Sequence, residues 1–192
     1  QRTEGETCQS CHMPDRRHLW RGIHDPETVR EALKLEVVSL EENGDSLAVE
    51  VRLSNAGAGH HLPTYVTPKL FVRTRLLDGT SQPLAGTDAV RAIGREIVLS
   101  TEEYREVFDT RIPAGGQWVW RYAQAQRAAA VALEVRVEVH PDHFYLGFFE
   151  AYSREGLSPK ATAMIDSAEA TARRSPYPLM ARQWPLTDLA GE

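Results

Sequence analysis

The sequence predicts a mainly β protein with some α, in which a β-sandwich follows a short amino-terminal segment and precedes a carboxy-terminal helix. Short runs of alternating apolar and polar residues, separated by turns containing Gly and Pro, recur through the middle of the chain, which is typical of β-sandwiches. One long helical pattern follows these runs. The chain has 192 residues, of which 42% are hydrophobic and 26% charged, enough for one globular domain with an appendage.

The first predicted element of this fold is a short helix at the end of the amino-terminal segment. Asp25, Pro26 and Glu27 supply an N-cap, a proline at the first helical position and an acid in the first turn, which together favour a helix start. Residues 28–34 continue the helical pattern. We therefore expect a helix immediately before the first strand.

Strand patterns dominate the middle of the chain. Residues 35–40 and 46–53 alternate and flank Asn43-Gly44, a dipeptide typical of two-residue hairpin turns. Further runs complete six or seven predicted strands: 70–76, 96–99, 117–123 and 132–139.

The carboxy-terminal region combines a helix with a proline-containing tail. Residues 159–173 carry the long helical pattern, and their apolar positions are mostly small, which favours close packing on the sheet: Ala163, Ile165, Ala168 and Ala172. Residues 175–185 contain three prolines, so we expect them to wrap the surface as irregular chain.

Charge and hydropathy exclude several classes of protein. The net charge is −5 and the isoelectric point is near 5.8, which argues against nucleic acid or an anionic membrane surface as a partner. No run approaches the ~18 apolar residues of a membrane-spanning helix. The first residues, Gln1 to Glu6, contain no apolar signal-peptide core, so the sequence is expected to be a mature form or a fragment.

The strongest motif lies near the amino terminus. Cys8 and Cys11 are the only cysteines, and His12 follows directly, giving the C-x-x-C-H pattern of c-type haem attachment. Two thiols at this spacing can reach the two vinyl groups on one porphyrin edge, and the next histidine then lies under the iron. The sequence predicts one covalent haem c, with His12 as an axial iron ligand.

Other sites could use the same residues. Cys8, Cys11, His18 and His24 have the ligand types of a zinc site, although six residues between the pairs is short against the ~12 of a zinc finger. A thioredoxin-type redox pair would need a strand before Cys8 and a helix after it, which the seven preceding residues and Pro14 disfavour. A simple disulfide loop is the third alternative.

Three short blocks resemble multihaem c-type cytochromes of the c554-like type. Residues 5–14 resemble their last haem site, and residues 18–26 resemble a following H-x-F-x-G-x-H-D-P stretch. Residues 55–64 resemble a turn of the form N-x-G-A-G-H-x-x-P-T in their β-rich domain. The resemblance implies exported electron-transfer proteins, usually with bis-histidine haems. This chain has one C-x-x-C-H where such proteins usually have several, so it looks like their carboxy-terminal part or a single-haem relative.

The second axial ligand has several candidates. The resemblance places a histidine at His60, and Gly57 and Gly59 would let the backbone before it bend and approach a flat porphyrin. His24 is twelve residues from His12 and His18 is six, so His24 could reach around the porphyrin more easily. We rank His60 first, His24 second and His18 third. A spare histidine could ligate a haem of a neighbouring subunit and so link a homo-oligomer.

Other residues near the motif have secondary roles. We expect Trp20 to cover a face or edge of the haem. Met164 or Met180 could also supply the second axial ligand, but a core position is the commoner fate of a methionine, and His140 and His143 are expected to be structural.

These expectations divide the chain into a haem-binding segment at 1–34, a β-sandwich domain at 35–150, and a helix with a wrapping tail at 151–192.

The favoured function is one-electron transfer in the periplasm or outside the cell, to a redox partner protein or a neighbouring haem subunit. The alternative is a five-coordinate haem gas sensor or haem enzyme, which needs an open sixth position. A third class is a docking module in which the haem is subsidiary.

Overall fold

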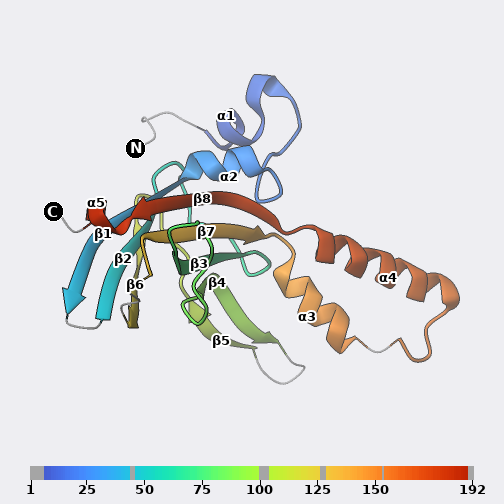
Figure 1. Ribbon diagram of the computed structural model, residues 1–192. Coiled ribbons are helices and arrows are strands. Elements are labelled where there is room, and N and C mark those ends of the chain that lie inside the picture. Colours follow the sequence, from blue (N-terminus) through green and yellow to red (C-terminus); the bar gives the residue numbers. More distant parts are fainter. Residues whose placement is uncertain (1–6, 44–45, 100–103, 126–128, 153, 190–192) are drawn as a thin grey trace.

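The computed structural model contains two antiparallel β-sheets, with one pair of helices beside them and another extending away (Figure 1). It describes all residues except 1–6, 44–45, 100–103, 126–128, 153 and 190–192. The first sheet has three strands in the order β1 (Leu33–Asn43), β2 (Ser46–Asn55) and β6 (Gln117–Ala125). The second has five, in the order β5 (Tyr104–Asp109), β4 (Ala89–Leu99), β3 (Lys69–Leu77), β7 (Ala132–His140) and β8 (Tyr177–Pro185).

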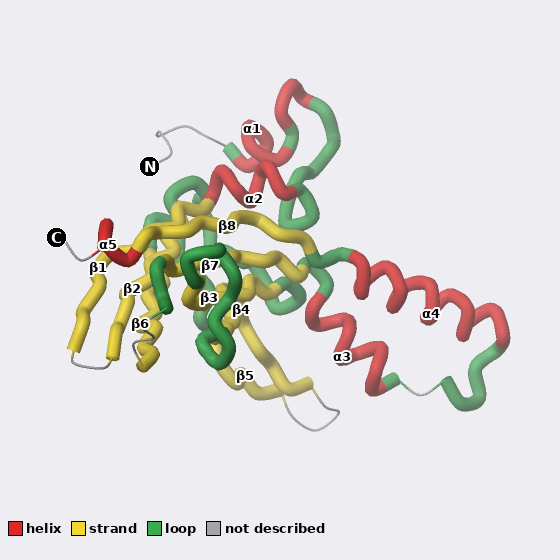
Figure 2. The backbone as a smooth tube through the Cα atoms, in the orientation of Figure 1, coloured by secondary structure: helices red, strands yellow, loops and turns green. Residues whose placement is uncertain are grey.

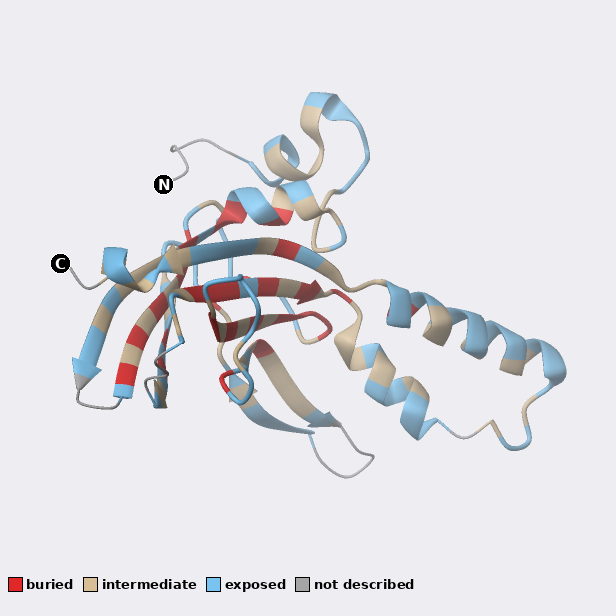
Figure 3. Cartoon of the chain, in the orientation of Figure 1, coloured by how far each residue is buried: buried red, intermediate tan, exposed pale blue. Residues whose placement is uncertain are grey.

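The core lies between the two sheets. Alternate residues along the central strands are buried, as a two-sheet packing requires, and Figure 3 shows the buried positions concentrated on β2, β3 and β7. β2 contributes Val49, Val51 and Leu53, and β7 contributes Val135 and Val137, all with no exposed surface. The predicted mainly β fold with a sandwich-like core and a carboxy-terminal helix is confirmed.

Apart from the short α5, the helices fall into two groups (Figure 2). Near the amino terminus lie α1 (Cys8–His12), a 3-10 turn at Pro14–Arg16, and α2 (Pro26–Ala32). Beyond β7 come α3 (His143–Ala151) and α4 (Pro159–Arg174), and α5 (Leu186–Leu189) ends the described chain. No helix among the described residues is long and apolar enough to cross a membrane.

The predicted helix after Asp25 is present. The Asp25 carboxylate accepts a hydrogen bond from the Thr28 amide at 3.0 Å, and this bond to the backbone holds the pKa of Asp25 below its usual value. The helix ends at Ala32, before the predicted 34, because β1 already begins at Leu33.

The prediction of an irregular tail was wrong. Residues 177–185 form β8, which pairs with β7 in antiparallel register. Pro178 sits where the register shifts between Val137 and Glu138, and β8 is an edge strand. An edge strand can hold prolines because the missing amide can face away from the ladder.

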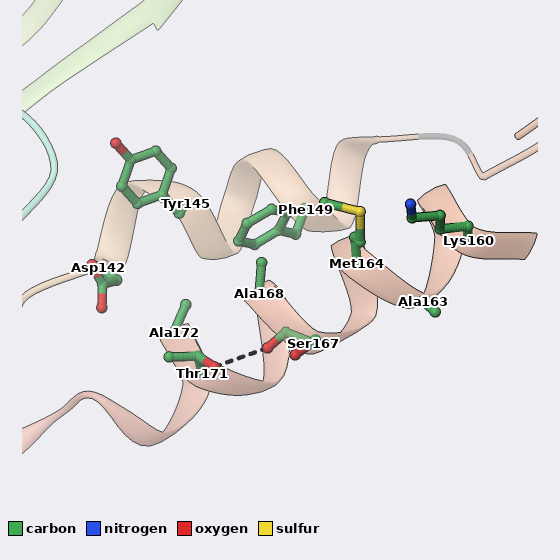
Figure 4. A pocket seen from close by; sticks show the side chains of 10 residues that line it. All are labelled: Asp142, Tyr145, Phe149, Lys160, Ala163, Met164, Ser167, Ala168, Thr171 and Ala172. Atoms are coloured by element: carbon green, nitrogen blue, oxygen red, sulfur yellow. Dashed lines mark hydrogen bonds between the residues drawn. The ribbon is translucent and has the colours of Figure 1, made fainter. Parts of the chain in front are cut away.

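The prediction that the carboxy-terminal helix packs on the sheet was also wrong. α4 contacts α3 instead, and together they extend away from the sandwich as an arm (Figures 1 and 2). Ala172 is the one buried residue among the described positions of α4. Ala168 and Ala172 of α4 line a groove together with Tyr145 and Phe149 of α3 (Figure 4), a helix that the sequence pattern does not predict.

Candidate functional site

The C-x-x-C-H motif forms helix α1. Thr7 is its N-cap, and its hydroxyl oxygen accepts a hydrogen bond from the Ser10 amide at 3.4 Å. Residues three apart on a helix lie on one side, so Cys8 and Cys11 are neighbours. Cys8 is exposed and Cys11 is half-buried. This arrangement fits two thioether bonds to one edge of a porphyrin.

Backbone hydrogen bonds hold His12 in one orientation. Nδ1 of His12 donates to the carbonyl oxygen of Arg21, and the Arg21 amide donates to the carbonyl oxygen of His12 at 3.0 Å. A carbonyl oxygen can only accept, so the proton of the neutral ring is on Nδ1 and the lone pair is on Nε2. Histidines that ligate metals usually have this arrangement.

His60 repeats the arrangement in the loop after β2. Its Nδ1 lies 2.9 Å from the carbonyl oxygen of His61 and 3.3 Å from the Thr64 hydroxyl. By the same argument, Nδ1 carries the proton and Nε2 carries the lone pair. Within the described part of the chain, Nε2 of neither His12 nor His60 has a hydrogen-bond partner.

The two histidines lie close together with nearly parallel rings. Their ring centres are 6.1 Å apart and the planes differ by 15°. When two imidazoles bind opposite sides of one metal ion, each metal–nitrogen bond is about 2 Å and each ring centre lies ~1 Å beyond its nitrogen. The two ring centres are then about 6 Å apart. The separation of His12 and His60 therefore has the dimension of a bis-histidine site.

A buried asparagine shapes the loop that carries His60. Asn55 has no exposed surface, and its amide donates to the carbonyl oxygens of His60 at 2.8 Å and Ile112 at 3.1 Å. Its side-chain oxygen accepts from the Ala58 amide at 3.0 Å. Asn55 is the first residue of the turn at 55–64, and an Asn before a glycine-rich run is typical of a side-chain-stabilised turn.

The same loop packs against the end of α2. The amides of Ala56 and Gly57 both donate to the carbonyl oxygen of Ala32. A Cβ on Gly57 would lie 2.4 Å from the carbonyl oxygen of Glu31, whereas one on Gly59 would meet nothing within 4 Å. Gly57 is therefore required for the contact with α2. This role differs from the one that the sequence predicts, in which Gly57 lets the backbone approach a porphyrin.

The amino-terminal segment is fastened to the sandwich through β8. The Tyr177 hydroxyl donates to the carbonyl oxygen of Ile23 at 2.7 Å, and burial raises the pKa of Tyr177. Arg30 donates to the carbonyl oxygen of Leu179 at 3.2 Å. Val29 and Ala32 of α2 are part of the main core. These contacts fix the position of His12 relative to the loop of His60.

Two adjoining cavities surround the histidine pair. One of about 460 Å³ is lined by Cys8, His12, Trp20, His60, Tyr65 and Pro68, among others. A smaller one of about 60 Å³ is lined by His12 and His60 together with apolar residues that include Val29, Ala32 and Leu62. Two thiols, two histidines with available Nε2 atoms and an apolar wall are the groups that a c-type haem needs, so the residues present fit this cofactor.

The other predicted residues occupy different positions. Trp20 stacks on His12 with ring centres 5.4 Å apart and is 64% exposed. Nε2 of His24 lies 3.1 Å from the carboxylate of Asp142 at the start of α3, so this ring already has a partner. His18 is exposed. Among the described residues, no three of the types His, Cys, Asp and Glu are grouped as a metal site would need, so the zinc alternative has no assembled ligand set.

The remaining histidines and methionines lie away from the pair. His140 and His143 contact the ring of Phe71, and burial, with Lys69 nearby, lowers the pKa of His143. Met164 is 65% exposed on α4, which contradicts the expectation of a core residue, whereas Met180 packs against the core from β8.

Comparison with known proteins supports the fold. No protein-family model and no curated protein matches the chain. A penta-heme cytochrome c552 from Thermochromatium tepidum superposes with a TM-score of 0.64 at 13% identity, covering 94% of this chain and 47% of that one. A β-glucosidase from Kluyveromyces marxianus also matches, with a TM-score of 0.28 at 9% identity over 80% of this chain and 14% of that one. This chain spans about half the length of the cytochrome, and its fold is similar to part of a multihaem c-type cytochrome.

Proposed function

We propose that this chain is a c-type cytochrome that transfers single electrons through one covalent haem with His12 and His60 as axial ligands. The observation that carries the proposal is the pair of imidazoles 6.1 Å apart, each with Nδ1 bonded to a carbonyl oxygen, beside two thiols on one helical turn. The fold similarity to a multihaem cytochrome supports it.

Each residue has a defined part in this proposal. Cys8 and Cys11 form the two thioether bonds, which make retention of the cofactor independent of pocket affinity. The carbonyl oxygens of Arg21 and His61 hold the protons on Nδ1, which fixes the ring orientations and makes the Nε2 atoms stronger ligands. The haem iron, when bound, takes up and releases one electron.

Two histidine ligands determine the chemistry that the site favours. A six-coordinate iron has no position for a gas or a substrate, which disfavours the sensor and enzyme alternatives. Histidine at both positions gives a lower reduction potential than a histidine and a methionine. Because thioether attachment occurs outside the cytoplasm, the proposal includes export, with a redox protein or another haem subunit as partner.

A spectroelectrochemical titration of the matured protein tests this function. We expect one reversible one-electron transition, a low-spin c-type spectrum in both states, and no change when carbon monoxide is added to the reduced protein. A high-spin spectrum that shifts with carbon monoxide would support the sensor or enzyme alternative. Absence of haem after expression with the maturation machinery would reject the proposal altogether.

A further inference from the structure

The chain between His12 and Arg21 forms a closed loop at the edge of the candidate haem site. Nδ1 of His12 donates to the carbonyl oxygen of Arg21, and the Arg21 amide donates back to the carbonyl oxygen of His12, so the two ends are held together. Figure 1 shows this loop beyond α2, away from the two sheets. Residues 15–20 are all exposed. The 13–20 loop is therefore an outward-facing border of the site that contains His12.

The 13–20 loop presents two arginines whose charge the described chain does not neutralise. The guanidinium groups of Arg16 and Arg17 have no hydrogen bond or ion pair among the described residues. Asp15 is the one acid in the loop and bonds to neither of them. By contrast, the Arg21 guanidinium at the end of the loop lies 3.6 Å from the carboxylate of Asp25. The net charge of the whole chain is −5, so the exposed loop has the opposite sign to the chain as a whole.

The nearby acids of α2 face a different cation. Glu27 and Glu31 line a cavity of about 320 Å³ together with Cys11 and Arg21. Neither Arg16 nor Arg17 is among the residues that line this cavity. The carboxylates of α2 are therefore matched with Arg21, and the charges of Arg16 and Arg17 remain available to another molecule.

The backbone of the loop is held in a costly conformation. Asp15, Arg16 and Trp20 have φ angles of 55°, 59° and 45°, in the left-handed region that favours glycine. Each such residue costs of order 1 kcal/mol, and strain of this kind clusters at functional sites. Next to the two arginines, the loop exposes Leu19 by 45% and Trp20 by 64%. The Trp20 ring also stacks on His12, so the exposed strip ends against the candidate iron ligand.

An acidic protein fits this strip. Guanidinium groups pair with carboxylates in a fixed, bidentate geometry, and arginine and tryptophan are enriched where proteins bind one another. Complexes between electron-transfer proteins are at the small end of protein interfaces, below ~1,200 Å² in total, so a projecting loop is compatible with docking although it forms no groove. A partner bound there lies beside Trp20 and His12, next to the haem site.

We propose that the 13–20 loop docks the redox partner, and that this partner is an acidic protein whose carboxylates pair with Arg16 and Arg17 beside Leu19 and Trp20. The inference rests on the proposed function, because it concerns electron exchange with a haem held at His12. The exchange moves one electron from the reduced haem to the oxidised centre of the partner, and no bond forms or breaks. Docking depends on the local charge of the loop and not on the net charge of the chain.

Stopped-flow oxidation of the reduced, matured full chain by an acidic blue-copper protein tests the docking surface, at ionic strengths from ~10 mM to ~0.5 M. Both proteins have a net negative charge, so encounters governed by net charge become faster as salt screens the repulsion. Docking through Arg16 and Arg17 becomes slower, because salt screens the attraction. We expect the second-order rate constant of the wild type to fall as the ionic strength rises.

Two double variants separate local charge from net charge. Arg16→Gln with Arg17→Gln should lower the rate constant at ~10 mM by about 10-fold or more and abolish its fall with salt. Lys160→Gln with Arg174→Gln is the matched control. It removes the same two charges from exposed positions of α4, where neither residue has an ion pair among the described residues. The control should behave as the wild type does.

The reduction potentials of the same proteins identify the other possible partner of the arginines. If Arg16 and Arg17 pair with the propionates of their own haem, the loop variant has a lower potential and the salt dependence of the wild type, which overturns the proposal. A wild-type rate constant that rises with ionic strength, or a control that matches the loop variant, also overturns it. A haem with a normal one-electron transition but the wrong salt dependence rejects the docking surface alone, whereas absence of haem rejects the proposed function and this inference with it.

Discussion

The imidazole rings of His12 and His60 lie 6.1 Å apart, with planes 15° from parallel. They come from separate elements, α1 and the loop after β2, and each is held by a hydrogen bond from Nδ1 to a backbone carbonyl oxygen. Because both rings are oriented by the backbone, the site is preorganised and does not depend on mobile side chains. Residues that hold these two backbone segments should therefore control both stability and iron ligation.

Asn55 is the first such residue. Replacing it with Ala removes three hydrogen bonds and leaves the carbonyl oxygen of His60 and the Ala58 amide without this partner, while the carbonyl oxygen of Ile112 keeps its bond from the Leu62 amide. We expect a loss of about 2–3 kcal/mol in the free energy of unfolding, measured by denaturant titration. We also expect a partly high-spin haem, since the His60 backbone is released. Ser54→Ala, at the neighbouring position, is the control. Equal stability of the two variants would show that Asn55 does not organise the loop.

Gly57 and Gly59 form a matched pair for testing the packing of this loop. Gly57→Ala brings a Cβ to 2.4 Å from the Glu31 carbonyl oxygen and 2.9 Å from the Ala32 Cα, whereas Gly59→Ala meets nothing within 4 Å. Overpacking against backbone should cost about 1–3 kcal/mol at position 57. At position 59 the change should be close to neutral or slightly stabilising. Thermal melts compare the two variants, and a larger loss for Gly59→Ala would contradict the described approach of the loop to α2.

The Glu134 carboxylate should make stability depend on acid pH. Burial opposes its ionisation, but hydrogen bonds from Arg136, Gln183 and Arg75 outweigh burial and lower the pKa of Glu134 from 4.5 to about 2. A carboxyl group whose pKa is lower in the folded than in the unfolded state stabilises the fold. This contribution is complete at pH values above the unfolded-state pKa and is lost as the pH falls from about 4.5 towards 2.

Glu134→Gln should therefore be less stable than the wild type by about 2 kcal/mol at pH 7, and the difference should shrink at pH 3 and below. Urea titrations at several pH values measure it. Glu138→Gln, on the same strand with a side chain that is 43% exposed, should have little effect. A gap between wild type and Glu134→Gln that stays constant from pH 7 to pH 2.5 would rule out this origin of the stability.

The sequence indicated much of the fold because several of its signals are local. The capping residues at Asp25 and the alternating runs on either side of Asn43-Gly44 each depend on a few adjacent residues, and the structure has the α2 helix and the antiparallel β1–β2 pairing as expected, while residues 44–45 of the predicted turn lie outside the described residues. The rest depends on distant contacts. β8 is a strand because β7 offers an edge, and aromatic residues, which favour strands as a rule, form helix α3 instead.

The ranking of the candidate ligands also depends partly on local sequence and partly on distant contacts. Sequence spacing left His24 close behind His60, since both could reach an iron held by His12. In the structure, His24 differs from His60 because its Nε2 is bonded to Asp142, which is 118 residues away in sequence. No local pattern at His24 could have indicated this contact.

The most direct test of the account is the optical spectrum of His60→Ala, oxidised, reduced, and reduced under carbon monoxide. If His60 is the second axial ligand, the variant becomes high-spin and binds carbon monoxide, and added imidazole restores the low-spin spectrum, while His61→Ala, His24→Ala and His18→Ala resemble the wild type. If His60→Ala stays low-spin and insensitive to carbon monoxide, and His24→Ala or His18→Ala becomes high-spin instead, the pairing of His12 with His60 is not the iron site.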